Sequence, residues 1–264
     1  METHHSDPIA IGCLNCNTET HGKYCHECGQ KTGTHRITLS HFITHDLVHG
    51  VWHLDKGLLF TLKESVLRPG YMAVNYIRGS RTKYYNVFYL ALLVIGLNVL
   101  VSQYFHGQTA SHESPQAAGI VLEKDTVDIS YYINHYFKLL LFLLVPFFAF
   151  AGLRSFKKLN FNFAEHAVIG GHLLLTGTLW SFVLILFMQA AFRQPYLVLD
   201  YVLYGLLGVL FLLPVRIYYQ ATRTQYKLLR FLVQIILWYV WFFFQVFLVM
   251  VVVAMLTGKT NIKL

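Results

Sequence analysis

The residues whose types and spacing most clearly indicate a chemical role are four cysteines near the amino terminus. Cys13 and Cys16 form one CxxC pair, and Cys25 and Cys28 form a second. Four thiolates at this spacing can surround one zinc ion tetrahedrally, with zinc–sulfur distances of about 2.3 Å and no open position for a substrate. Metal binding then supplies the folding free energy of a segment that has little core of its own. The pattern therefore predicts one structural, non-catalytic zinc ion per chain.

Two residues beside the cysteines favour this prediction. Gly29 permits a left-handed turn after the second pair, and Asn17 can adopt one after the first. The alternatives are two disulfides, free thiols, or replacement of one thiolate by His21 or His26. A reducing cytoplasmic location disfavours disulfides, and the complete set of four cysteines makes histidine ligands unnecessary.

A second set of candidate ligands follows the cysteines. Four histidines are spaced by four residues, and they are His41, His45, His49 and His53. Apolar residues at helical intervals continue this segment to about Leu67, where Arg68-Pro69-Gly70 should end the helix. The histidines fall on the face opposite the apolar stripe. The segment is therefore expected to form an amphipathic helix at the membrane interface.

This histidine helix has three interpretations. The simplest is a polar face whose histidines form hydrogen bonds or contact lipid head groups. The second is a metal or catalytic site, although the four histidines rise about 18 Å along a helix and cannot share one ion. The third is a proton-sensing site. Further candidate ligands at the inner end of the third apolar run are Glu165, His166 and His172.

Basic residues cluster directly before the first long apolar run. They are Arg68, Arg78, Arg81 and Lys83, with tyrosines between them. Arginine, lysine and tyrosine in this position are typical of anchoring at the membrane interface. A specific site for a phosphate head group is the alternative, because guanidinium groups bind phosphate oxygens in pairs.

The composition is that of a membrane protein. Of 264 residues, 55% are hydrophobic and 13% are charged, which excludes a soluble cytosolic enzyme, a secreted domain and a disordered chain. Five apolar runs reach the length of about 20 residues that a membrane span needs. They are residues 86–105, 136–156, 168–192, 196–219 and 228–256. The sequence therefore predicts an all-α polytopic membrane protein with a zinc ribbon over 1–36, an interfacial segment over 37–85 and a transmembrane bundle over 86–264.

The distribution of lysine and arginine predicts the orientation. With the amino terminus inside, the outer segments carry only five of the 21 lysines and arginines, namely Lys124, Lys138, Arg193, Lys259 and Lys263. The positive-inside rule then favours a cytoplasmic amino terminus and, after five spans, a periplasmic carboxyl terminus. Contact with anionic lipid head groups accounts for the net charge of +8, so a nucleic-acid partner is not expected.

The order of these motifs resembles that of a family of bacterial membrane proteins of unknown function, common in Bacteroidota, with an amino-terminal zinc ribbon. The matching features are the paired CxxC motifs and residues 24–31, His45-Asp46 with His49 and His53, Asp55-Lys56-Gly57 with Thr61, Arg68-Pro69-Gly70, and residues 76–81. The resemblance covers about residues 10–90. Gly79-Ser80-Arg81 departs from the usual Gly-Lys-Arg, and Asn86-Val87 replaces a usual proline neighbourhood. The resemblance implies a bacterial inner-membrane location and no particular activity.

Three classes of function fit these features. A membrane scaffold or regulatory protein, whose ribbon and helix bind a protein partner, agrees best with a closed metal site. A small transporter or lipid-handling protein requires polar residues of the last three spans to converge on a cavity. A metal-dependent membrane enzyme requires His45, His49, Glu165, His166 and His172 to lie within bonding distance. An oligomer is compatible with all three.

Overall fold

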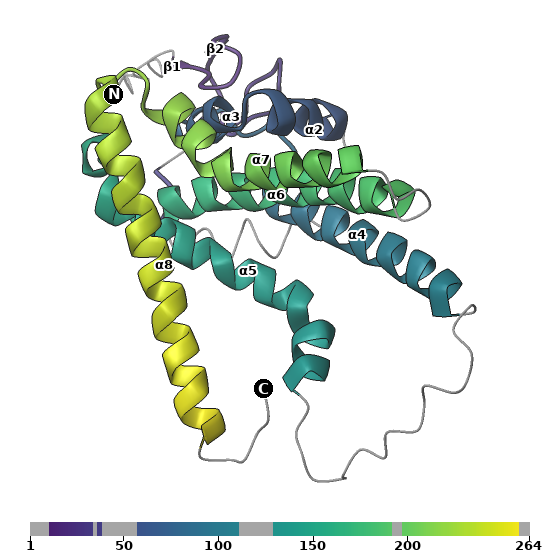
Figure 1. Ribbon diagram of the computed structural model, residues 1–264. Coiled ribbons are helices and arrows are strands. Elements are labelled where there is room, and N and C mark those ends of the chain that lie inside the picture. Colours follow the sequence, from purple (N-terminus) through teal and green to yellow (C-terminus); the bar gives the residue numbers. More distant parts are fainter. Residues whose placement is uncertain (1–10, 34–35, 39–56, 111–128, 192–196, 259–264) are drawn as a thin grey trace, which may run out of the picture.

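The computed structural model describes residues 11–33, 36–38, 57–110, 129–191 and 197–258. A short antiparallel hairpin of β1 (Ile11–Gly12) and β2 (Glu19–Thr20) comes first. Two short helices, α2 (Gly57–Leu67) and α3 (Pro69–Ile77), follow it. The long helices shown in Figure 1 are α4 (Val87–Ala110), α5 (Ile129–Ser155), α6 (Phe163–Ala191), α7 (Leu197–Thr222) and α8 (Leu228–Gly258). The predicted helical fold class is confirmed.

Four of the long helices have the length and composition to cross a membrane. Their apolar stretches are Val87–Phe105, Phe163–Met188, Leu203–Thr222 and Leu228–Val253. They lie in α4, α6, α7 and α8, where the first, third, fourth and fifth runs were predicted. The second predicted run lies in α5, whose described apolar stretch, Leu141–Ser155, is shorter. The structure therefore supports four candidate spans, and a span formed by the second run, in α5, stays a prediction.

The central helix of the bundle is α6. It packs against α4, α5 and α7, while α8 packs mainly along α5 (Figure 1). A Cβ atom on Gly170 would lie 3.1 Å from the carbonyl oxygen of Val145 in α5. A Cβ atom on Gly171 would lie 2.6 Å from the ring of Phe88 in α4. The two glycines therefore permit the close approach of both neighbouring helices.

Helices α2 and α3 form a hairpin that packs on α6 and α7. The end of α2 at Leu67 agrees with the sequence, but Pro69 then begins α3, where no helix was predicted. Proline suits the first turn of a helix because its missing N–H would have no partner there. Gly70 lies against the backbone of Ile217 in α7, and its N–H donates to Oε1 of Gln220 at 2.9 Å.

The buried side chains of α2 are polar. Thr61 and Ser65 are both fully buried, whereas Leu59 is 76% exposed. The Thr61 hydroxyl accepts the N–H of Tyr85 at 2.8 Å, and the Ser65 carbonyl accepts the hydroxyl of Thr176 at 3.0 Å. Thr61 and Ser65 continue the four-residue spacing of the histidines, which were expected to form hydrogen bonds or contact lipid head groups. In α2 this face packs inward, where Tyr85 supplies the partner of the Thr61 hydroxyl and the Ser65 hydroxyl donates to the carbonyl of Thr61.

Candidate metal centre

Each cysteine pair lies in a tight turn. In the first turn, the N–H of Cys13 donates to the carbonyl of Thr18 at 2.9 Å, and the N–H of Asn17 donates to the carbonyl of Cys13 at 2.8 Å. In the second, the N–H of Gly29 donates to the carbonyl of Cys25 at 2.9 Å. The φ angles of Asn17 and Gly29 are 62° and 71°. Both predicted left-handed turns are therefore present, and they reverse the chain directly after each pair.

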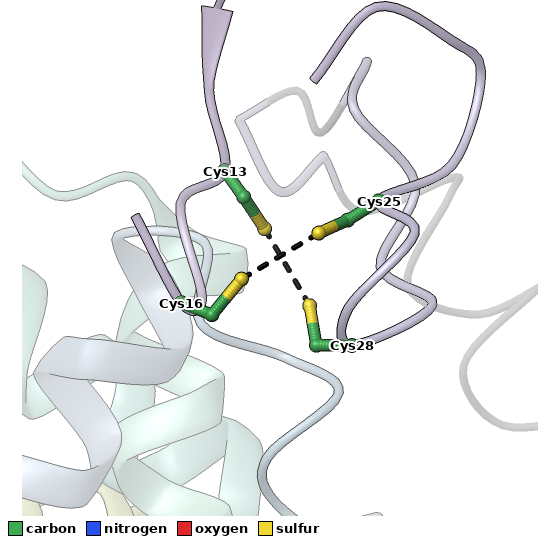
Figure 2. A group of neighbouring side chains, drawn as sticks. All are labelled: Cys13, Cys16, Cys25 and Cys28. Carbon is green, nitrogen blue, oxygen red and sulfur yellow. Dashed lines mark hydrogen bonds between the residues drawn. The ribbon is translucent and has the colours of Figure 1, made fainter. Parts of the chain in front are cut away.

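The four sulfur atoms converge on one point, as Figure 2 shows. They all lie within 4.8 Å of one another. The Sγ atoms of Cys13 and Cys28 are 3.5 Å apart, and so are those of Cys16 and Cys25, so that each close contact joins the two turns. Sulfurs placed 2.3 Å from a tetrahedral zinc ion would be about 3.8 Å apart. The cluster therefore has the size of a closed four-sulfur metal site.

The surroundings of the cluster favour a thiolate at Cys16, whereas burial and the neighbouring sulfurs of Cys16 and Cys28 raise the pKa of Cys25. A hydrogen bond with the Thr18 hydroxyl, at 3.3 Å, lowers the pKa of Cys16 to about 6. The N–H of Asn15 points toward the sulfur of Cys13 at 3.5 Å. Hydrogen bonds of this kind stabilise the deprotonated sulfur, which is the form that binds a metal. A metal ion can be held by three or more cysteine, histidine or acidic side chains that lie close together. Among the described residues, the four cysteines form such a group.

The ribbon, here residues 11–33, is fastened to the loop after α3. Gln30 is 4% exposed; its Nε2 donates to the carbonyl of Gly79 at 2.7 Å, and its Oε1 accepts the N–H of Arg81 at 3.0 Å. Leu14 fills the space beside Gly79, whose φ angle is +116°, and the Leu14 carbonyl accepts the Ser80 hydroxyl at 2.8 Å. The basic loop that was predicted to anchor the chain in lipid therefore also holds the ribbon.

A second attachment joins the segment after the ribbon to the start of α6. Arg36 donates from Nε and Nη2 to the two carboxylate oxygens of Glu165, each at 2.8 Å. The N–H of Asn162 donates to Glu165 at 2.8 Å, and the Asn162 side chain accepts the N–H of Glu165 at 2.9 Å. This reciprocal pair is a capping box at the first turn of α6. Glu165 is thus a helix cap and an ion-pair partner.

The two histidines of α6 are buried against other groups. Nδ1 of His172 lies 2.8 Å from the carbonyl of Val168, and its ring packs edge-on against Tyr76. The ring of His166 packs edge-on against Phe161. Among the described residues, these histidines and Glu165 do not form a ligand group of the kind that the cysteines form. His41, His45, His49 and His53 lie outside the described residues, so a second metal or proton site that includes them stays a prediction.

The four cations proposed for head-group contacts lie in different surroundings. Arg68 forms an ion pair with Glu64 at 2.9 Å. Arg81 and Lys83 lie over aromatic rings, at 5.9 Å and 4.9 Å from the ring centroids. Arg78 follows the last residue of α3 as its C-cap and is exposed. Binding of a head group by these residues stays a prediction.

An apolar cavity of about 410 Å³ opens between α5, α6, α7 and α8. Its walls include Phe148, Leu174, Leu210 and Phe242. The hydroxyl of Thr178, which also lines the cavity, donates to a backbone carbonyl of α6. The described residues therefore do not form the convergence of polar side chains on a cavity that a transporter would require. An apolar cavity of this kind suits a hydrocarbon chain better than a polar solute.

Two attachment residues were missed by the sequence analysis. Gln30 gave no signal beyond its place after the second cysteine pair, and Arg36 meets Glu165 across 129 positions of the chain. The spacing of Asn162 and Glu165 is a recognisable capping-box pattern and could have assigned Glu165 to a helix start. Comparison with protein-family models, curated proteins and solved structures finds no match for this chain.

Proposed function

We propose that this chain is an integral protein of the bacterial inner membrane that acts as a scaffold or regulatory protein. A zinc-bound ribbon would hold the cytoplasmic face of the bundle in a fixed arrangement and offer a surface to a protein partner. The observation that carries this proposal is the double attachment of the ribbon segment. Gln30 binds the loop after α3, and Arg36 binds the first turn of α6. Membership of the zinc-ribbon family that the motifs resemble is part of the same proposal.

Zinc is the metal we propose for the cysteines. Four thiolates in a closed tetrahedral arrangement are a common structural zinc site, and soft thiolate ligands favour zinc over magnesium or calcium. Bound zinc would supply about 10–16 kcal/mol toward folding of the ribbon at neutral pH. The strands of the described ribbon are only two residues long, so a metal is a reasonable source of its stability.

The proposed orientation rests on where the cations lie. Arg154 lies in the last turn of α5, Lys157 and Lys158 lie between α5 and α6, and Arg223 and Lys227 lie between α7 and α8. Arg36, in the segment after the ribbon, contacts the start of α6, which is at the same end of the bundle. By the positive-inside rule this end faces the cytoplasm. Reporter fusions should then place the ribbon inside and the carboxyl terminus outside if α5 crosses.

A partner can reach the outer surface of the ribbon. Tyr24 is 63% exposed, and Lys23 and His26 beside it are exposed too. Exposed tyrosines are frequent energetic centres of protein interfaces. A photo-crosslinking amino acid at position 24, in intact membranes, should therefore give a discrete crosslinked product. The product should disappear in a Cys25→Ser background and be absent with the crosslinker at the exposed Lys63 of α2; products of equal yield at both positions would contradict the scaffold function.

The apolar cavity favours a second candidate function, the handling of a lipid. Gly177 lines this cavity, and a Cβ atom there would meet only Leu213, at 4.0 Å. Gly177→Leu should fill the cavity with little strain and remove lipid that copurifies with the protein, as measured by native mass spectrometry. Gly208→Leu is the matched control, because a Cβ atom at Gly208 meets nothing within 4 Å. Equal lipid content in both variants would argue against this second function.

A further inference from the structure

A second pocket, of about 430 Å³, lies where α5 ends and α8 begins. Its lining includes Arg154, Ser155, Lys157, Lys158, Arg230 and Gln234. We infer that this pocket binds a terminal phosphate group, meaning a phosphate that is free or carries a single ester bond, as in inorganic phosphate or the head group of phosphatidic acid. The site is separate from the cysteine cluster and from the cations that precede the first span. It goes beyond the proposed function and does not depend on zinc.

The pocket is lined by four positively charged side chains, and no acidic side chain in its lining balances them. Two side chains come from the last turn of α5, two from the short turn that follows it, and Arg230 and Gln234 lie one helical turn apart on α8. The ion pairs among the described residues involve Arg36 and Arg68 and leave these four cations without one. Cations gathered in a concave site attract and concentrate anions.

A buried hydroxyl gives independent support. Ser155 is 3% exposed, and its Oγ has no hydrogen-bond partner among the described residues. Three buried hydroxyls in other helices donate to the carbonyl four residues earlier, and they belong to Ser65 in α2, Thr176 in α6 and Thr222 in α7. Ser155 lines the pocket, and its hydroxyl donates to none of the described residues. A buried hydroxyl without a partner is unfavourable, so a bound anion that accepts its proton would satisfy it.

Aromatic rings hold two of the cations in place. The guanidinium of Arg154 lies 5.2 Å from the ring centroid of Phe150 and 5.5 Å from that of Trp241. The ammonium of Lys158 lies 5.5 Å from the ring centroid of Tyr226, whose hydroxyl accepts the Lys158 N–H at 3.0 Å. Positioned guanidinium and ammonium groups together with a hydroxyl donor are suited to the several oxygens of a terminal phosphate group.

The test uses the full-length protein in neutral detergent at constant ionic strength. Dioctanoyl phosphatidic acid, inorganic phosphate and dioctanoyl phosphatidylcholine are titrated separately, and binding is followed by calorimetry and by tryptophan fluorescence, to which Trp241 contributes. The first variant is Lys157→Gln/Arg230→Gln. Its matched control, Lys63→Gln/Lys227→Gln, removes two exposed cations that do not line the pocket. The second variant, Ser155→Ala, keeps every charge and removes no hydrogen bond within the described residues.

We expect saturable binding of phosphatidic acid at one site per chain and no saturable binding of phosphatidylcholine. Affinity should fall about tenfold in Lys157→Gln/Arg230→Gln and about fivefold in Ser155→Ala, and change less than about twofold in the control. Inorganic phosphate that binds as tightly, with the same losses, would support the site with a soluble ligand. Tight binding of the lipid alone would support it with a head group. Equal losses in both double variants, or no saturable binding of either phosphate, would overturn the inference.

Discussion

The ribbon and the first half of α6 both carry candidate metal ligands, yet only the ribbon brings them together. The sulfur atoms of the four cysteines lie within 4.8 Å of one another. In α6, Glu165 binds Arg36 and His172 contacts a backbone carbonyl. The difference lies in the backbone, since left-handed residues reverse the chain after each cysteine pair, whereas neighbouring side chains on a helix point about 100° apart. Ligand types that are close in sequence make a site only where the chain turns their side chains to one point.

The two regions also differ in what stabilises them. The ribbon contributes few fully buried apolar side chains, whereas α6 contributes a long series of them to the core of the bundle. Removing a ligand should therefore unfold the ribbon, but removing a polar side chain should only weaken α6.

Cys25→Ser should abolish metal binding and unfold the ribbon. Three thiolates hold zinc much less tightly than four, and the ribbon then loses most of the roughly 10 kcal/mol or more that the metal supplies. Elemental analysis should show close to no zinc, and limited proteolysis should cleave within the ribbon while the long helices stay protected. The exposed neighbour Glu27→Gln is the control and should keep both properties. A Cys25→Ser protein that retains zinc and protease resistance would contradict the proposed site.

Glu165→Ala should destabilise the protein without changing its metal content. The variant loses the ion pair with Arg36 and the capping box of α6, which together should cost about 2–3 kcal/mol in the free energy of unfolding. Thermal denaturation in detergent measures this loss, and the exposed Glu19→Ala should change the free energy by less than about 0.5 kcal/mol. A loss of bound metal in Glu165→Ala would show that α6 does contribute a ligand.

Gln30→Ala should weaken the attachment of the ribbon to the loop after α3, while the ribbon keeps its metal and its other contacts. The variant leaves the carbonyl of Gly79 and the N–H of Arg81 without these contacts, at a cost of about 1–2 kcal/mol. Hydrogen exchange of the amide of Thr82, which donates to Oε1 of Gln30 at 3.3 Å, should become faster, and zinc content should stay at one ion per chain. Lys23→Ala, on the exposed side of the ribbon, should leave the exchange unchanged. Unchanged exchange in Gln30→Ala would mean that the attachment does not depend on this side chain.

His45→Gln/His49→Gln should have the smallest effect. If these histidines form only a polar face, glutamine keeps their hydrogen bonding, and the metal content of the purified protein should not change. Glutamine is a poor ligand for a transition metal. A loss of one metal ion per chain, with the ribbon still folded, would therefore reveal a second metal site and favour a membrane metalloenzyme.

Local patterns in the sequence predicted the parts that depend on local forces. The left-handed turns at Asn17 and Gly29 and the end of α2 at Leu67 follow from residue types within a few positions. The apolar stretches of α4, α6, α7 and α8 follow from composition alone. These features could be predicted because each is stabilised by its own segment or by the membrane.

Contacts between distant segments could not be predicted in this way. Gln30 meets Gly79 across 49 positions, and Arg36 meets Glu165 across 129. On the inward face of α2, the Thr61 hydroxyl is satisfied by the N–H of Tyr85, which lies 24 positions later in the chain. Amphipathic periodicity assumes that polar side chains face away from the interior, and it fails where another segment offers partners.

Zinc K-edge X-ray absorption of the purified full-length protein, combined with elemental analysis, would identify the metal and the ligands held by the four cysteines. We expect one zinc ion per chain with a single shell of four sulfur neighbours at about 2.3 Å. A shell that contains nitrogen or oxygen would show that a histidine or another group replaces a thiolate. That result, or a protein with all four cysteines and no bound metal, would contradict the structural zinc ribbon on which the proposed function rests.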